Sequence, residues 1–82
     1  MTPWKVVGFE KFKNESGEDC VRVYVVRPLA LAEGHQGEGF ETQRLYFKPK
    51  YVQYEPEVNH LIVAVEGRYG IGQIIVLGRD KN

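Results

Sequence analysis

Two segments of the chain, residues 20–27 and 40–48, carry aromatic and basic side chains at alternating positions. Alternate side chains of an extended strand point to the same face, so a hairpin of these segments would gather them on one surface. That surface carries Arg22, Tyr24, Arg44, Tyr46 and Lys48. Cations that follow phosphates, and rings on which bases stack, are the groups by which proteins bind single-stranded nucleic acid. The pattern therefore predicts a nucleic-acid-binding face.

The opposite face of the same two segments is apolar. It carries Val21, Val23, Val25, Leu45 and Phe47. We expect these side chains to form the core. The face of rings and cations also has a purely structural interpretation, because exposed Tyr, Arg and Lys are ordinary cross-strand pairs on a sheet. The alternation by itself leaves both interpretations open.

Residue patterns typical of catalysis or metal binding are missing from the sequence. The single cysteine, Cys20, makes no recognisable metal-ligand spacing with His35 and His60. The sequence contains no phosphate-binding loop, nucleophile elbow or recognisable histidine–carboxylate spacing. We expect a protein that is not an enzyme and that uses no cofactor and no metal.

Length and charge limit what the chain can do. Its 82 residues predict one domain, residues 1–82, with a thin core, because a chain of this size buries only about 60–65% of its unfolded surface. One cysteine allows no internal disulfide, so we expect stabilisation by self-association, as a homodimer. Eleven basic residues balance eleven acidic ones. This balance argues mildly against a nucleic-acid partner, although binding depends on local charge.

The sequence also bears on location. A lone cysteine favours a reducing compartment. No apolar stretch approaches the roughly 18–20 residues of a membrane span, and the N-terminal residues lack the basic region and apolar run of a secretory signal. We therefore expect a cytoplasmic protein with no membrane partner.

Period-two alternation of β-branched and aromatic residues dominates the chain, and helical periodicity is nearly absent. The predicted strands span residues 4–13, 20–27, 40–48, 58–66 and 69–77. Residues 14–19 form a turn with Gly17 at positive φ, residues 29–39 a glycine-containing loop, and residues 50–57 a short connection or one helical turn. The sequence predicts an all-β protein, a small five-stranded antiparallel barrel that is OB-like, with an SH3-like barrel as the alternative.

Glycines punctuate the last two predicted strands. Glu66-Gly67-Arg68 predicts a compact hairpin in which Gly67 adopts the left-handed conformation. Gly70 and Gly72 lie two residues apart inside the last strand, where glycine indicates coiling, a bulge or the close approach of another backbone. We expect them either to allow the bend that barrel closure needs or to leave a bare strip against which another molecule lies.

The layout resembles the single-stranded-DNA-binding proteins of the filamentous-phage gene V (helix-destabilising) type. The segments "VRVYVVRP", "QRLYFKP" and "GRYGIGQIIVLG" carry the resemblance, together with the length, the all-β pattern and the absence of disulfides. The resemblance implies a small OB-like barrel that dimerises and coats single strands. It also implies stacking roles for Tyr24 and Tyr46 and phosphate contacts for Arg22, Arg44 and Lys48.

Two functions follow as hypotheses. The leading one is sequence-tolerant binding of single-stranded DNA, in a phage, plasmid or mobile-element context, and the sequence leaves open whether RNA is bound instead. The alternative is a protein-interaction module that docks a peptide or a partner subunit, because aromatic surfaces also serve proline-rich and strand-adding ligands.

Overall fold

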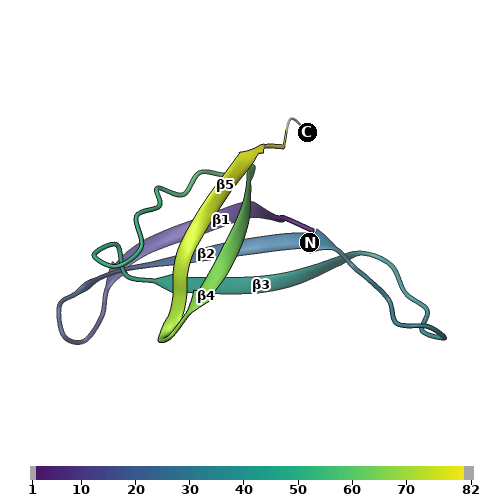
Figure 1. Ribbon diagram of the computed structural model, residues 1–82, viewed down its shortest axis with the longest axis horizontal. Coiled ribbons are helices and arrows are strands. Elements are labelled where there is room, and N and C mark those ends of the chain that lie inside the picture. Colours follow the sequence, from purple (N-terminus) through teal and green to yellow (C-terminus); the bar gives the residue numbers. More distant parts are fainter. Residues whose placement is uncertain (1, 81–82) are drawn as a thin grey trace.

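The computed structural model describes residues 2–80, which form one antiparallel sheet of five strands (Figure 1). The strands are β1 (Trp4–Lys13), β2 (Asp19–Pro28), β3 (Phe40–Phe47), β4 (His60–Gly67) and β5 (Gly70–Arg79). The all-β prediction is confirmed, and each predicted strand matches an observed one to within two residues at its ends. Residues 1, 81 and 82 of the predicted domain lie outside the described part. No helix able to cross a membrane occurs in residues 2–80.

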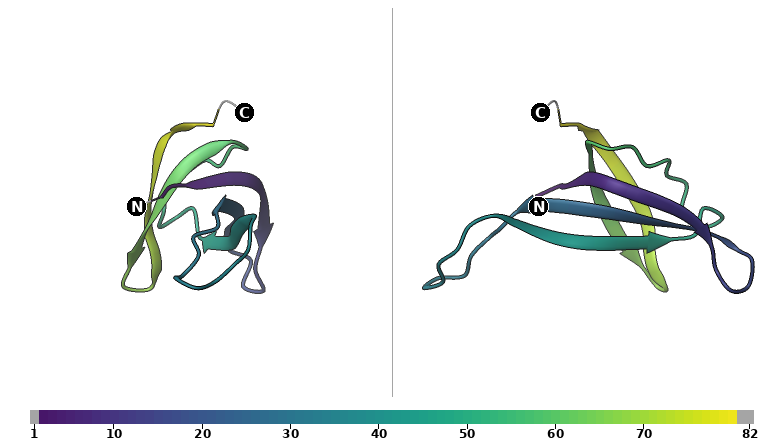
Figure 2. Two further views of the ribbon diagram at one scale, coloured as in Figure 1. Left: turned by 90° about the vertical axis from the view of Figure 1, so that its right-hand side faces the viewer. Right: turned by 180° about the vertical axis from the view of Figure 1, so that it is seen from behind.

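Strands β1, β2 and β3 form a meander, and β4 and β5 form a hairpin that crosses over it (Figures 1 and 2). The order across the sheet is β3-β2-β1-β4-β5. The turn between β1 and β2 is fixed by Asn14, whose Oδ1 accepts hydrogen bonds from the backbone N–H groups of Ser16 and Glu18. Gly17 has φ 78° in this turn, as predicted.

The core lies between the meander and the hairpin. Its buried apolar side chains are Trp4, Val6, Val21, Val23, Val25, Leu45, Phe47, Val52, Ile62 and Ile74. The predicted apolar face of β2 and β3 is therefore part of the core. Each such β-branched or aromatic side chain contributes roughly 1.5–3 kcal/mol when it is fully buried, so this layer holds the two parts of the sheet together.

The sheet is not closed into a barrel, which corrects the closure expected from the sequence. Within residues 2–80, β3 and β5 are the two edge strands and no ladder joins them. The reason lies in the short β1–β4 ladder, which comprises only Trp4↔Ile62 and Lys5↔Leu61. The hairpin turns away from the meander beyond these pairs, so its outer edge does not come into register with β3. A small β-rich domain of this kind is compatible with OB-like or SH3-like architecture.

A β-bulge in β1 changes which side chains lie together. The ladder passes from Val6↔Val25 to Gly8↔Tyr24, so Val7 is the extra residue on β1. Such a bulge reverses the alternation for the rest of the strand. Glu10 and Phe12 therefore lie on the same face as Arg22 and Tyr24, opposite the core.

The glycines of the β4–β5 hairpin are explained by the hairpin itself. Gly67 pairs with Gly70 across the loop residues Arg68 and Tyr69, and the positive φ, 110°, belongs to Gly70. The expectation that Gly67 is left-handed is therefore wrong. Gly67 is the last residue of β4, and the loop residues after it reverse the chain. Gly72 is the extra residue of a second bulge, in keeping with the local bend predicted for it.

A side chain at Gly67 would collide with the partner strand. A Cβ built there lies 3.2 Å from the backbone Cα of Gly72, whereas one built at Gly8 meets nothing closer than 3.9 Å. We expect Gly67→Ala to lower the free energy of unfolding by about 1–3 kcal/mol, the range for overpacking. Urea denaturation with Gly8→Ala as the matched control measures this, and equal stabilities of the two variants would contradict the account.

Candidate nucleic-acid interface

The face of β2 and β3 that points away from the core carries the predicted rings and cations. Arg22 lies directly opposite Tyr46, and Tyr24 lies directly opposite Arg44. Val21, Val23 and Val25 of β2 are buried on the other side. We call this surface the outer face, and it comprises Arg22, Tyr24, Arg44, Tyr46 and Lys48 with the neighbouring Glu10 and Phe12 of β1. Its arrangement agrees with the sequence prediction, while its binding role stays a prediction.

Rings and cations alternate in both directions on the outer face. Directly opposite side chains on paired strands lie about 5 Å apart, and successive side chains on one face of a strand about 7 Å apart. Each tyrosine therefore has an arginine opposite it and another basic residue two positions along its own strand. On such a pattern a base can stack on a ring while its phosphate contacts a nearby cation.

Glu10 occupies part of this surface. Its carboxylate forms an ion pair with Arg22 and accepts a hydrogen bond of 3.1 Å from the hydroxyl of Tyr24. This contact raises the pKa of Arg22 above its ordinary value. In the free protein one carboxylate thus holds both an arginine and a tyrosine of the outer face in place.

Glu18 performs the same task at the end of β3. It accepts hydrogen bonds from Lys48 at 3.0 Å, from Lys50, and from Asn14. The bonds from Lys50, Lys48 and Asn14, in that order of effect, lower the pKa of Glu18 to about 2. The same contacts raise the pKa values of both lysines. Glu18 therefore stays ionised and ties the β1–β2 turn to the segment that follows β3.

Tyr46 contacts the sulfur of Cys20 and the ring of Phe12. Its Oη lies 3.0 Å from Sγ of Cys20, and its ring centroid lies 6.2 Å from that of Phe12. The contact with Cys20, followed by desolvation, raises the pKa of Tyr46. The phenol therefore stays neutral at physiological pH, and with 44% of its surface exposed it keeps a ring face open to a base.

Arg44 differs from the other cations of the outer face. It is exposed, and no ion pair or hydrogen bond joins its side chain to another residue in the described part of the chain. Arg22 and Lys48, by contrast, each have a carboxylate partner. Arg44 is therefore the outer-face cation that can meet a phosphate without first giving up a partner.

Sequence reasoning missed Glu10 and Phe12. Simple alternation from the buried Trp4 and Val6 places both side chains on the core face, and only the bulge at Val7 turns them outward. The signal was present in part, because a charged residue two positions after Gly8 does not suit the core face of a strand. The bulge at Val7, three residues before Glu10, resolves that conflict.

Tyr54 and His60 form a contact that resembles the start of a catalytic relay. The hydroxyl of Tyr54 lies 2.8 Å from Nδ1 of His60, and Nε2 of His60 lies 2.9 Å from the carboxylate of Glu57. Burial raises the pKa of Tyr54, so its phenol is protonated and is not an activated nucleophile. The contact instead fastens the connection between β3 and β4 to the core.

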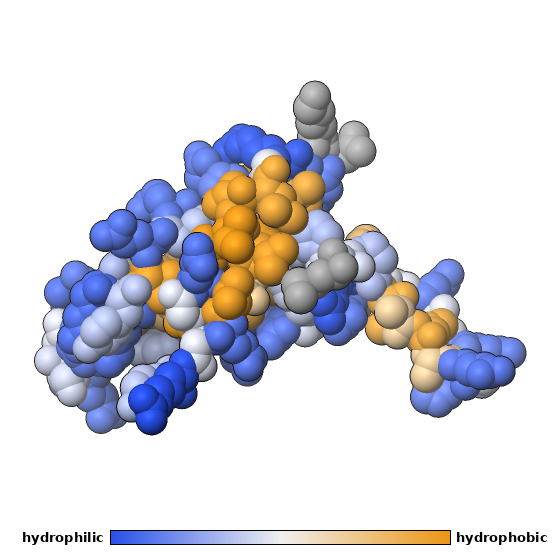
Figure 3. Space-filling view, in the orientation of Figure 1, coloured by the Kyte–Doolittle hydropathy of each residue, from blue (hydrophilic) through white to orange (hydrophobic). Residues whose placement is uncertain are grey.

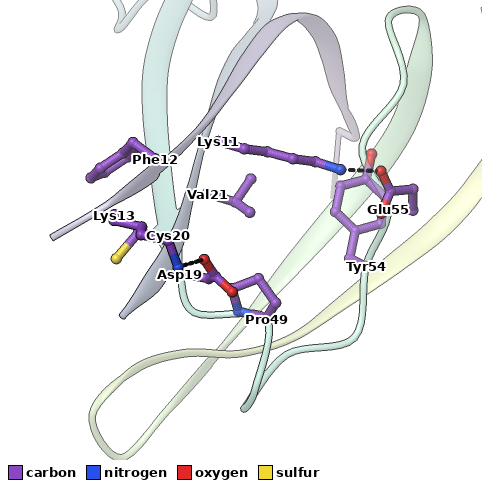
Figure 4. Close-up of a pocket in the computed structure, with 9 residues that line it drawn as sticks. All are labelled: Lys11, Phe12, Lys13, Asp19, Cys20, Val21, Pro49, Tyr54 and Glu55. Atoms are coloured by element: carbon purple, nitrogen blue, oxygen red, sulfur yellow. Dashed lines mark hydrogen bonds and ion pairs between the residues drawn. The ribbon is translucent and has the colours of Figure 1, made fainter. Parts of the chain in front are cut away.

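A hollow of about 480 Å³ lies beside the end of β1 and the start of β2 (Figure 4). Two ion pairs lie in its wall, Lys11 with Glu55 and Lys13 with Asp19. Its four charged groups therefore neutralise one another. Residues 2–80 hold no cluster of histidine, cysteine and carboxylate side chains that could bind a metal ion.

Comparisons with known proteins give no relative. No family model, no curated protein and no solved structure matches this chain. The function must therefore be inferred from the geometry of the outer face and its surroundings.

The Glu18 cluster predicts a pH dependence of stability. The folded pKa of about 2 lies below the ordinary 4.5, so its stabilising contribution is present above pH 4.5 and is lost as the pH falls towards 2. We expect the Tm of the parent to exceed that of Glu18→Gln at pH 6 and the two to converge near pH 2. Thermal denaturation across this range tests it, with Glu15→Gln as the control that follows the parent. A constant difference would contradict the assignment.

Proposed function

We propose that the protein binds single-stranded DNA, with little sequence preference, on the outer face. The observation that carries the proposal is the alternation of Tyr24 and Tyr46 with Arg22 and Arg44 on one exposed surface of two paired strands. Ring stacking tolerates any base, because every base has a π face. The resemblance to phage helix-destabilising proteins supports the same function and a phage, plasmid or mobile-element context.

Local charge supports the proposal although the net charge is zero. Four cations, Arg22, Arg44, Lys48 and Lys50, lie on or at the end of the outer face, against the two carboxylates Glu10 and Glu18. Other acidic residues, among them Glu33 and Glu38, lie in the loop 29–39, which projects from the body beyond the opposite end of β3 (Figures 1 and 2). The chain thus separates its charges, and the outer face carries a local positive excess.

The existing ion pairs are compatible with phosphate binding. Exposed pairs contribute only about 0–1 kcal/mol each, and the Arg22 pair with Glu10 is exposed, whereas the Lys48 pair with Glu18 is partly buried. A phosphate can therefore replace Glu10 as the partner of Arg22 at little cost. Arg44 needs no such exchange.

Titration of a fluorescent oligothymidylate at low and moderate salt tests the proposal. We expect Tyr24→Ala and Tyr46→Ala each to weaken binding by about 1–3 kcal/mol, because each removes a stacked base. Tyr24→Phe and Tyr46→Phe keep the ring and should bind much more tightly than the alanine variants. Absence of binding by the parent at micromolar protein and low salt would reject the function. An oligouridylate of equal length in the same assay decides between DNA and RNA.

Arg44 gives a separate test of phosphate contact. Binding to single strands weakens with salt in proportion to the number of neutralised phosphates, by a slope of about 0.7 per contact. We expect Arg44→Ala to weaken binding and to reduce the steepness of the logarithmic salt dependence by about 0.7. Glu33→Gln, in the projecting loop 29–39, provides a variant for comparison. An unchanged slope would place Arg44 away from the phosphates.

Self-association remains part of the proposal, in the form of a homodimer. The radius of gyration is 14.1 Å, against about 12 Å expected for a compact chain of this length. The accessible surface is 6172 Å², on the order of 1,000 Å² more than a monomer of this mass usually exposes. A standard interface buries about 800 Å² per partner. The excess surface is therefore enough for one interface.

One group of exposed apolar side chains lies over the β4–β5 hairpin (Figure 3). Val65, Ile75, Val76 and Leu77 are between 39% and 58% exposed, and β5 is an edge strand with respect to the described residues. A two-fold contact through this surface would complete the core, as the sequence predicts. It lies apart from the tyrosines of the outer face and leaves them accessible.

Leu77 is the test position for the dimer, because it is the most exposed apolar side chain of this group, at 58%. We expect the parent to elute as a dimer in size-exclusion chromatography with light scattering, and Leu77→Lys to shift it to a monomer that stays folded by circular dichroism. Leu31→Lys, in the projecting loop, is the control that should remain dimeric.

A monomeric parent would refute the homodimer. A parent that stays monomeric and binds no oligonucleotide would favour the alternative, a module that docks a peptide or a different subunit on the same apolar surface.

A further inference from the structure

A groove lies where the sheet stays open between β3 and β5. Its volume is about 660 Å³, within the 300–1,000 Å³ typical of ligand sites. One wall is the end of β3 with the turn that follows it, and the other is the tip of the β4–β5 hairpin. Tyr46 lines the groove and also belongs to the outer face, so the two surfaces are continuous.

Three tyrosines surround the groove. Tyr46 comes from β3, Tyr51 from the following turn and Tyr69 from the hairpin loop. Tyr51 is 72% exposed and Tyr69 is 94% exposed. Rings with this much free surface contribute little to the core, and they gain most from a ligand that stacks on them. Only the fold brings these three rings together, because the segments that carry them are separate in the sequence.

Part of the groove wall formed by the hairpin is bare backbone. Gly67, Gly70 and Gly72 line it, and the backbones of Gly67 and Gly72 approach so closely that a Cβ on either would lie 3.2 Å from the other's Cα. No side chain projects from these positions, so a flat group can reach the backbone. The bare strip expected from the sequence therefore exists, although the hairpin's own close approach also requires it.

The charge of the groove selects the class of ligand. Lys48 and Arg68 line it, and no aspartate or glutamate does so. The guanidinium of Arg68 lies 5.9 Å from the ring centroid of Tyr69, and Nζ of Lys50 lies 5.0 Å from that of Tyr51. Lys48 and Lys50 share Glu18 as their partner, whereas Arg68 has no ion pair with another described residue. Flat rings beside Arg68 suit a ligand that combines an aromatic plane with a negative charge. A proline-rich peptide could use the rings but would give Arg68 no anionic partner.

We propose that this groove binds nucleotides of the same single strand that crosses the outer face. The strand continues from Tyr24 and Tyr46 around the edge of β3, a base stacks on Tyr51 or Tyr69, and a phosphate contacts Arg68. This inference rests on the proposed function and extends its site by a second group of residues, which the fold brings together from separate segments.

Oligothymidylate titration of groove variants tests the proposal. Tyr51→Ala and Tyr69→Ala should each weaken binding of a ten-nucleotide strand about 5- to 150-fold, the loss expected for one stacked base. Tyr69→Phe should retain most of the affinity. Phe40→Ala is the matched control, because Phe40 is an exposed ring, 67% exposed, at the opposite end of β3. It should bind like the parent.

Ultraviolet cross-linking with 5-iodouracil-substituted strands gives a second readout, because it reports contact directly. Cross-links to Tyr51 or Tyr69, found by mass spectrometry, support the path through the groove.

If the parent binds and Tyr24→Ala weakens binding while both groove variants bind like the parent, the groove inference is overturned and the proposed function stands. If the parent binds no strand, the proposed function itself fails. Binding of decaproline that is lost in Tyr69→Ala, without an effect on the oligonucleotide, would make the groove a peptide site and overturn the inference.

Discussion

The pairing register of β2 and β3 is the constraint on which the rest of the structure depends. Val23 faces Leu45 on the core side, and Arg22 faces Tyr46 on the other. Because side chains alternate, a slip of one residue in either strand would turn rings and cations inward and aliphatic groups outward. Burial of three valines on β2, each worth roughly 1.5–3 kcal/mol, opposes any such slip. The core therefore determines the composition of the outer face.

Two carboxylates immobilise side chains of the outer face without blocking the surface. Glu10 fixes Arg22 and Tyr24, and Glu18 fixes Lys48 at the end of β3. Long basic side chains lose considerable rotamer entropy when they are immobilised by a ligand. Part of that entropy is already lost in these pairs, and because the pair of Arg22 with Glu10 is exposed, Arg22 can exchange Glu10 for another anion. The same contacts thus contribute modestly to the fold and prepare the surface for a phosphate.

Incomplete closure of the sheet has consequences on two sides of the molecule. Between β3 and β5 it leaves the groove with Tyr51, Tyr69 and a bare glycine side. On the hairpin it leaves apolar side chains of β5 exposed along an edge strand. Both follow from a β1–β4 ladder of only two residue pairs. A closed barrel of the same length would have covered the apolar side chains and removed the groove, so the open sheet creates both the candidate binding surface and the candidate interface between subunits.

The sequence by itself determined the strands, the β1–β2 turn and the two faces of β2 and β3, because period-two alternation and turn residues act locally. Tertiary structure alone decided the rest. The bulge at Val7, which turns Glu10 and Phe12 outward, depends on how β1 fits its neighbour. The strand order, the open edge and the meeting of Tyr46 with Tyr51 and Tyr69 depend on contacts between segments distant in the chain. Such contacts leave no periodic trace in the sequence, since they are fixed by packing and by the geometry of the short β1–β4 ladder rather than by neighbouring residues.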